Sequence, residues 1–262
     1  MKRTLVVASC LFFLTSTFVL AQNPFEGTWK ADPTTFQYPT KPDVYVLQNG
    51  MYECKTCAPK INVKADGTDQ RTPGNPYSDT EAVKVVDDHT VEFTDKKDGK
   101  VVGTSKTTVS SDGDTQSVTW TYSGNPDGKE TSGSSTAKRV AKGPAGAHLI
   151  SGSWKTEKSD ASADAMTWSY KFNSNEVTMT NPTGQSYTAK LDGSDAPYKG
   201  DPGTTSVSVK MMGKNTMEET DKRDGKAISI IKMTITPDGK TMHAVVEDKL
   251  HGTTVKGDAH KM

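Results

Sequence analysis

The sequence predicts an all-β protein built as two tandem antiparallel up-and-down β-barrels of about eight to ten strands each. Short runs rich in Val, Ile, Thr and aromatic residues alternate with turn residues along the chain. Beyond the amino terminus no segment has the 3.6-residue apolar period of a helix. The second half of the chain also repeats the first. So many short neighbouring strands must close into a barrel or stack as a sandwich to cover their edges.

Composition excludes several classes of protein. The chain has 262 residues, of which 32% are hydrophobic, and its 32 basic side chains are balanced by 32 acidic ones. A nucleic-acid-binding protein would need clustered Lys and Arg to neutralise phosphates, and no such cluster occurs. The low apolar content excludes a membrane protein with many spanning helices. A soluble protein with half-exposed strands fits these numbers.

The amino terminus has the pattern of a signal peptide. Residues 1–21 place Lys2 and Arg3 ahead of an apolar run and end at Ala21, with small residues around the expected cleavage site. We expect cleavage there and export of the mature chain to the periplasm or the extracellular space, with no membrane association afterwards. Lipid attachment at Cys10 and an uncleaved membrane anchor are the alternatives.

An internal duplication organises the mature chain. Residues 65–115 align without a gap with residues 191–241, and Thr94–Lys100 is nearly identical to Thr220–Lys226. A fixed offset of this kind is the mark of a repeat architecture.

The duplication sets the expected domain boundaries. We expect a first barrel at residues 22–140, a linker at 141–148 that is rich in small and turn-forming residues, and a second barrel at 149–262. Each repeat has the size of one compact domain.

Turn motifs indicate how the strands connect. The first repeat contains strand-like runs at Asp43–Leu47, Ile61–Ala65, Ala82–Val86 and Thr90–Phe93. Asp98-Gly99 and Asp224-Gly225 each lie between two such runs, where a type I′ turn requires two residues that tolerate positive φ. These sites predict tight hairpins.

Hairpin geometry allows a prediction of the inner face. Pairing Lys97 with Lys100 across the first turn places Val91 opposite Lys106, because register is fixed by the turn. The predicted inner face comprises Val91, Phe93, Lys106, Val118 and Trp120, and in the second repeat Met217, Ile228, Ile230, Met242, Ala244 and Val246. The opposite face, expected to meet water, holds Gly103, Ser105, Thr107, Ser117 and Thr119.

Two lysines on this predicted inner face suggest a ligand site. Lys106 and Lys232 occupy the same position in the two repeats, and a buried ammonium needs a partner. Glu219 could pair with Lys232, whereas Phe93 stands at the matching position of the first repeat. We therefore expect Lys106, with Phe93 and Trp120 nearby, to hold a ligand carboxylate. The alternative is that both lysines extend from a barrel rim into water.

A family resemblance adds to these patterns. The Gly-x-Trp openings at Gly27–Lys30 and Gly152–Lys155, followed by many strand-like runs, resemble lipocalin and fatty-acid-binding barrels. With Val63–Gly67 and Asp95–Lys100 the chain is similar to secreted bacterial proteins with lipocalin-like (calycin-type) repeats of unknown function. The resemblance covers the mature chain and implies a ligand-binding barrel, although fold alone does not establish function.

The resemblance also implies how each barrel is closed. In lipocalin-type barrels a tryptophan on the first strand closes one end, and a basic residue on the last strand packs over it. Trp29 with Arg139 would play these parts in the first repeat, and Trp154 with Lys261 in the second. Lys lacks the planar guanidinium of Arg and would stack less well.

Cys54 and Cys57 are the thiol pair left after removal of the signal peptide. In an exported protein two cysteines this close are expected to form a disulfide across a turn. A redox role and a metal or cofactor site are the alternatives, but redox Cys-x-x-Cys motifs open a helix and this one lies among strands. No catalytic constellation, metal-binding spacing or cofactor motif is found.

These observations lead to an expected function. We expect an exported, non-enzymatic lipocalin-like protein that binds a small hydrophobic or amphipathic molecule inside a barrel, without a cofactor. The first alternative is a structural or protein-interaction module whose barrels are filled by their own side chains. The second is the redox or metal role at Cys54 and Cys57.

Overall fold

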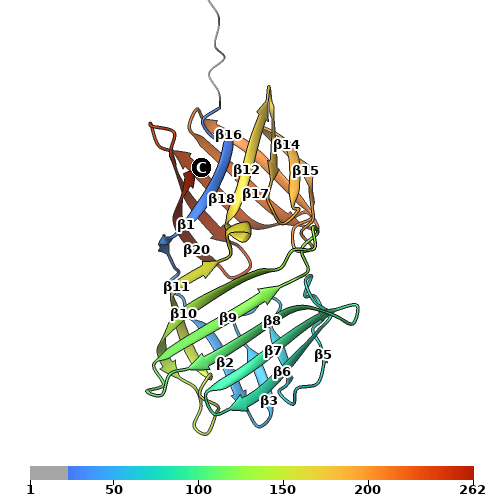
Figure 1. Ribbon diagram of the computed structural model, residues 1–262, viewed down its shortest axis with the longest axis vertical. Coiled ribbons are helices and arrows are strands. Elements are labelled where there is room, and N and C mark those ends of the chain that lie inside the picture. The colour runs from blue at the N-terminus through green and yellow to red at the C-terminus, as the bar shows by residue number, and fades with distance from the viewer. Residues whose placement is uncertain (1–22) are drawn as a thin grey trace, which may run out of the picture.

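The computed structural model describes residues 23–262 and shows two ten-stranded antiparallel β-barrels, as the sequence predicts (Figure 1). The predicted signal peptide and Cys10 lie outside the described residues. One short 3-10 helix, η1 (Ala163–Met166), accompanies the strands in the described part of the chain. No helix within residues 23–262 is long and apolar enough to cross a membrane.

The first barrel is a nearly closed sheet with the strand order β4-β3-β2-β11-β10-β9-β8-β7-β6-β5. An isolated bridge between Asp66 and Lys84 joins the region between its edge strands to the sheet. Its strands are β2 (Asp43–Gln48), β3 (Met51–Cys54), β4 (Ile61–Lys64), β5 (Gln70–Arg71), β6 (Thr80–Asp87), β7 (Thr90–Lys97), β8 (Lys100–Val109), β9 (Thr115–Tyr122), β10 (Thr131–Lys142) and β11 (Gly152–Ala161).

The second barrel is closed, with the strand order β1-β12-β13-β14-β15-β16-β17-β18-β19-β20 and β20 paired back to β1. Its strands are β1 (Gly27–Gln37), β12 (Thr167–Asn173), β13 (Glu176–Thr180), β14 (Ser186–Lys190), β15 (Asp192–Lys199), β16 (Ser206–Gly213), β17 (Thr216–Arg223), β18 (Lys226–Ile235), β19 (Thr241–Asp248) and β20 (Thr253–Lys261).

The two repeats exchange their first strands. β1, which opens the first repeat, pairs with β12 and β20 of the second barrel, and β11, which opens the second repeat, pairs with β10 and β2 of the first. In Figure 1, β1 (blue) lies among the yellow and red strands of the second barrel. The hydroxyl of Tyr38, just after β1, donates a hydrogen bond to the carbonyl of Ser159 on β11 at 3.3 Å, which ties the exchanged strands together. The sequence repeats and the folded barrels therefore do not coincide.

Exchange also changes the expected pairs at the barrel ends. The guanidinium carbon of Arg139 lies 4.0 Å from the ring centroid of Trp154, and the ammonium of Lys261 lies 5.0 Å from that of Trp29. Pairing Trp29 with Arg139, and Trp154 with Lys261, is therefore wrong. The physical reason is that each tryptophan moves with its exchanged strand, while each basic residue stays on the last strand of its own repeat.

A β-bulge alters the predicted inner face. Asp98 and Gly99 both have positive φ, 49° and 74°, and Lys97 pairs with Lys100 as expected. The register then shifts after Lys96, so that Asp95 lies opposite Gly103. One extra residue on β8 turns the side chains from Gly103 onward to the other face.

The same shift occurs in both barrels and corrects several positions. Lys106 pairs with Glu92, and Lys232 with Glu218, and both lysines are exposed on the outside. Ile230 likewise leaves the inner face, whereas Gly103, Ser105 and Thr107 join it, and Ile228 is the extra residue of the bulge and lines a cleft between the barrels. The remaining predicted inner positions are Val91, Phe93, Val118, Trp120, Met217, Met242, Ala244 and Val246, and these do lie on the inner side of their strands.

Candidate functional site

A cavity inside the second barrel is the candidate site. Its volume is about 330 Å³, and most of its lining is apolar or aromatic. Representative lining residues are Trp168, Tyr170, Tyr198, Ile231, Met233 and Ala244. This second-barrel cavity is at the lower end of the roughly 300–1,000 Å³ that small-molecule sites occupy.

Glu219 is a buried carboxyl group in the lining of this cavity. It lies on the inner face of β17 with 6% of its surface exposed, and it accepts a short hydrogen bond from the hydroxyl of Tyr187. The hydroxyl of Tyr170 lies 3.5 Å from the same carboxylate oxygen. Burial, reinforced by the charge of nearby Asp221, raises the pKa of Glu219 to about 8.

Asp221 forms a carboxyl pair with Glu219. The two residues are separated by one position on β17, so their side chains point to the same face. Burial, followed by the charge of Asp201, raises the pKa of Asp221 to about 6. Its Oδ1 atom is buried and has no hydrogen-bond partner among the described residues. Burial and the closeness of the two carboxyls therefore favour a pair that holds one proton between them at neutral pH.

A second unpartnered polar atom lies at the cavity. The indole Nε1 of Trp168 is buried and has no acceptor within residues 23–262. By contrast, the indoles of Trp29 and Trp154 donate to the carbonyls of Phe25 and Ile150 at 2.7 and 2.8 Å. A buried N–H without an acceptor costs free energy, so Trp168 offers a donor to whatever fills the cavity.

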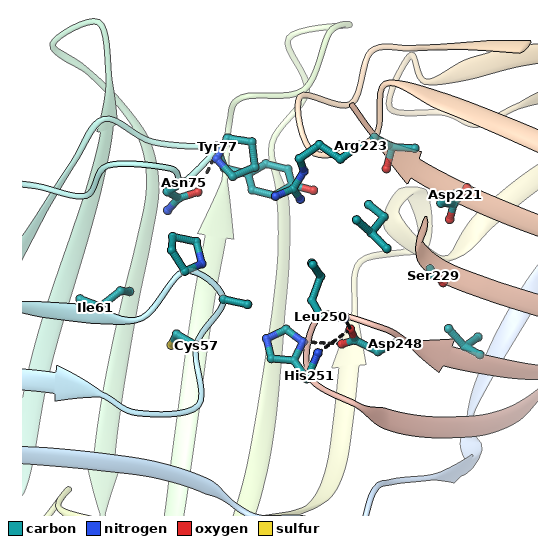
Figure 2. A pocket seen from close by; sticks show the side chains of 16 residues that line it. Cys57, Ile61, Asn75, Tyr77, Asp221, Arg223, Ser229, Asp248, Leu250 and His251 are labelled. Atoms are coloured by element: carbon teal, nitrogen blue, oxygen red, sulfur yellow. Dashed lines mark hydrogen bonds and ion pairs between the residues drawn. The ribbon is translucent and has the colours of Figure 1, made fainter. Parts of the chain in front are cut away.

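An inter-barrel cleft of about 530 Å³ adjoins the cavity (Figure 2). Cys57 and Tyr77 line it from the first barrel, and Asp221 and Arg223 from the second. Val246 lines both the cleft and the second-barrel cavity. Because Asp221 lines the cleft and Glu219 the cavity, the carboxyl pair lies between the two spaces.

The register places this cleft at the end of the second barrel that is remote from Trp29. Lys261 pairs with Trp29 at one end of β20, whereas Asp221 pairs with Ser229, and Ser229 with Asp248, at the other. In Figure 2 the side chains of Asp221, Ser229 and Asp248 come from neighbouring strands on one side, facing Cys57 and Tyr77 of the first barrel. The first barrel thus lies against this end of the second.

The first barrel fills its interior differently. Trp120 occupies the position that Val246 holds in the second repeat, and its ring lies so close to Gly133 that a Cβ there would be 2.4 Å away. Phe93 stands in place of Glu219 and packs edge-on against Tyr52 at 5.2 Å between ring centroids. Large aromatic side chains therefore occupy positions that are smaller or charged in the second barrel.

The predicted ligand residues of the first repeat lie around one hollow and not together inside the barrel. Lys106, Phe93 and Trp120 all line a surface hollow of about 560 Å³ over β7 to β10, but Lys106 lies on the outer face and Phe93 and Trp120 on the inner face. Lys232 lies outside on β18, and Glu219 alone reaches the second-barrel cavity.

The sequence reasoning missed Trp168 and Tyr170 as cavity residues, and Asp221 and Tyr187 as direct neighbours of Glu219. The signal that could have identified them is the alternation of Glu219 and Asp221, two acidic residues at inward positions of one strand, where apolar residues are the norm. This signal points to the cavity only when the inner face of the strand is assigned correctly.

Cys54 and Cys57 form a disulfide in the turn between β3 and β4. Cys54 is buried in the core of the first barrel, and Cys57 lines the inter-barrel cleft. The described residues contain no group of three or more His, Cys, Asp or Glu side chains placed to hold a metal ion.

Comparison with protein-family models finds none that matches this chain, and no curated protein matches it either.

Proposed function

We propose that this chain is an exported, non-enzymatic lipocalin-like protein that binds a small apolar or amphipathic molecule inside its second barrel. The observation that carries the proposal is the second-barrel cavity of about 330 Å³, with its apolar walls and two unsatisfied polar groups at its lining and its mouth. A ligand that covers this apolar surface and forms hydrogen bonds with the unsatisfied polar atoms would bind with a favourable free energy.

The first barrel has a supporting role in this proposal. Its aromatic residues occupy its own interior, and its loops line the inter-barrel cleft that adjoins the second-barrel cavity. This arrangement favours, for the first barrel alone, the alternative of a filled structural module. An interaction role of the inter-barrel cleft is compatible with it.

Two measurements test the proposal. Native mass spectrometry of the protein purified from its own host should detect a retained small molecule. Binding of a neutral apolar fluorescent probe, such as N-phenyl-1-naphthylamine, should occur with the recombinant protein and should be lost in Ala244→Phe, which fills the cavity.

Val118→Phe is the matched control, because Val118 is the counterpart of Ala244 in the first barrel and lies on its inner face opposite Thr107. Probe binding should survive in this variant. If Ala244→Phe folds and binds the probe as the wild type does, the second barrel is not the binding site.

A further inference from the structure

The carboxyl pair of Glu219 and Asp221 has no ion-pair partner in the described part of the chain. No ion pair among residues 23–262 involves Glu219 or Asp221. The nearest basic residues along β17 are engaged elsewhere, because Lys222 pairs with Asp195 and the Nε of Arg223 donates to the carbonyl of Gly203 at 2.7 Å. Lys256 on β20 lies at the cavity wall, but it is exposed at an outward position between Val255 and Gly257.

Aromatic side chains surround the carboxyl pair. Tyr170 on β12 and Tyr187 on β14 direct their hydroxyls toward Glu219, and Tyr198 on β15 packs against Tyr187 with ring centroids 5.6 Å apart. The titratable groups that face Glu219 are therefore these three tyrosines and Asp221, and Asp201 acts on Asp221. All of them are neutral or negative at pH 7, and tyrosine ring faces attract cations.

From this geometry we propose that the ligand of the second barrel is an amine, with an apolar body in the cavity and a protonated amino group that donates hydrogen bonds to Glu219. The inference rests on the proposed binding function and specifies its ligand class. Trp168 adds a donor that would bind an oxygen of such a ligand, since its Nε1 has no acceptor among the described residues.

The energetic reason is that folding has already buried the carboxyl pair. A buried ion pair is expensive when both partners lose their water on binding, but here Glu219 has lost most of its water before the ligand arrives. The incoming ammonium supplies the missing opposite charge. A carboxylate ligand would instead add a further negative charge beside Glu219 and Asp221, so fatty acids are excluded by the same argument.

The proposed binding of an ammonium group can be measured through the proton that the carboxyl pair releases. The carboxyl pair of Glu219 and Asp221, buried on one strand, shares a proton near pH 7, and the fully ionised form is the one that pairs with an ammonium. Binding of an ammonium therefore transfers this proton to the solvent. Affinity for an amine should rise between pH 6 and pH 8, and the calorimetric binding enthalpy at pH 7 should depend on the ionisation enthalpy of the buffer.

The experiment compares three probes of similar size by isothermal titration calorimetry on the full mature chain: 2-phenylethylamine, 2-phenylethanol and 3-phenylpropanoate. We expect the amine to bind at least about tenfold more tightly than the alcohol, because charge-assisted hydrogen bonds are about twice as strong as neutral ones. The carboxylate should bind weakest.

Variants assign this preference to Glu219. Glu219→Gln retains the side-chain shape and should lose the preference for the amine, the buffer dependence and the pH dependence, while it still binds 2-phenylethanol. Glu218→Gln, the neighbouring outward position, is the matched control and should behave as the wild type does. If Glu219→Gln does not fold, the buffer dependence of the wild-type enthalpy decides the matter.

The outcomes separate the two proposals. If the alcohol binds as tightly as the amine, or if amine binding releases no proton, the amine inference is wrong and the binding function stands. If neither these probes nor the neutral fluorescent probe binds, the proposed function fails and the amine inference fails with it.

Discussion

Arg139 packs its guanidinium group against the indole ring of Trp154 at one end of the first barrel. The group stacks 4.0 Å from the indole centroid and donates three hydrogen bonds to backbone carbonyls, those of Gly113, Leu149 and Ser151. At the corresponding end of the second barrel, Lys261 lies 5.0 Å from the Trp29 centroid and donates to the carbonyl of Pro24 at 3.1 Å.

This difference predicts unequal effects of two matched substitutions. Arg139→Ala removes the stacking and three charge-assisted hydrogen bonds, so it should lower the free energy of unfolding by about 2–4 kcal/mol. Lys261→Ala removes one hydrogen bond and a longer cation–π contact and should cost about 1 kcal/mol. Urea unfolding followed by tryptophan fluorescence measures both. If both substitutions lower the free energy of unfolding equally, the planar guanidinium group of Arg139 contributes nothing beyond its charge.

Strand exchange predicts which cysteine pairs can crosslink. Thr28 on β1 pairs with Ser169 on β12, and their hydroxyl oxygens are 2.8 Å apart. Paired positions on antiparallel strands have the Cα separation that a disulfide needs. Thr28→Cys with Ser169→Cys should therefore form a disulfide under oxidising conditions, detectable by peptide mapping.

The control for this crosslink uses the duplication itself. Ser153 is the counterpart of Thr28, and without exchange it would be the residue beside Ser169. In the exchanged structure Ser153 pairs with Val44 in the first barrel. Ser153→Cys with Ser169→Cys should therefore stay reduced, and a crosslink between them would show that the first strands are not exchanged.

The sequence could predict the number and kind of barrels because duplication, alternation and Asp-Gly turns are local signals. The hairpin at Asp98-Gly99 has the predicted turn and first pair. The sequence could not predict the exchange of first strands. Gly27–Lys30 and Gly152–Lys155 are nearly identical, so either segment could form the first strand of either barrel. Only the global connection of the chain decides between them.

The candidate site was out of reach for a second reason. The bulge on β8 opposite Asp95, repeated on β18 opposite Asp221, has no residue signature that distinguishes it from regular pairing. One extra residue nevertheless reverses the inward and outward faces of the rest of each strand. That reversal moved Lys106 and Lys232 outward. The sequence pattern suggests Glu219 only as a partner for Lys232, so it does not predict a place for Glu219 in a cavity beside Tyr170.

The outward position of Lys106 gives a direct prediction. Lys106 pairs with Glu92 across β7 and β8 on the exposed face, so Lys106→Ala should change the free energy of unfolding by no more than about 0.5 kcal/mol. Binding of a ligand inside either barrel should be unchanged, and Lys232→Ala should behave alike. A tenfold loss of affinity in Lys106→Ala, measured by calorimetry, would contradict the observed register.

The buried carboxyls predict how stability depends on pH. Burial raises the pKa of Glu81 to about 7, that of Asp221 to about 6 and that of Glu219 to about 8. In the unfolded chain these groups lose their protons near pH 4 to 4.5. Between that pH and the folded-state pKa the unfolded chain therefore binds fewer protons than the folded one, so stability falls as pH rises.

We expect the thermal unfolding midpoint to be at least about 3 °C lower at pH 8.5 than at pH 5, because a change of about 1 kcal/mol moves the midpoint by about 2–4 °C in a chain of this size. Glu219→Gln should reduce this difference and raise the midpoint at pH 8.5, since it removes a carboxyl that must ionise while buried. Glu218→Gln, on the outward side of β17, should leave the difference intact. Differential scanning calorimetry across this pH range measures the midpoint. A midpoint that stays constant or rises with pH would show that the buried carboxyls ionise in the folded protein at no cost in stability. The physical reason for expecting the cavity to bind a cation would then be lost.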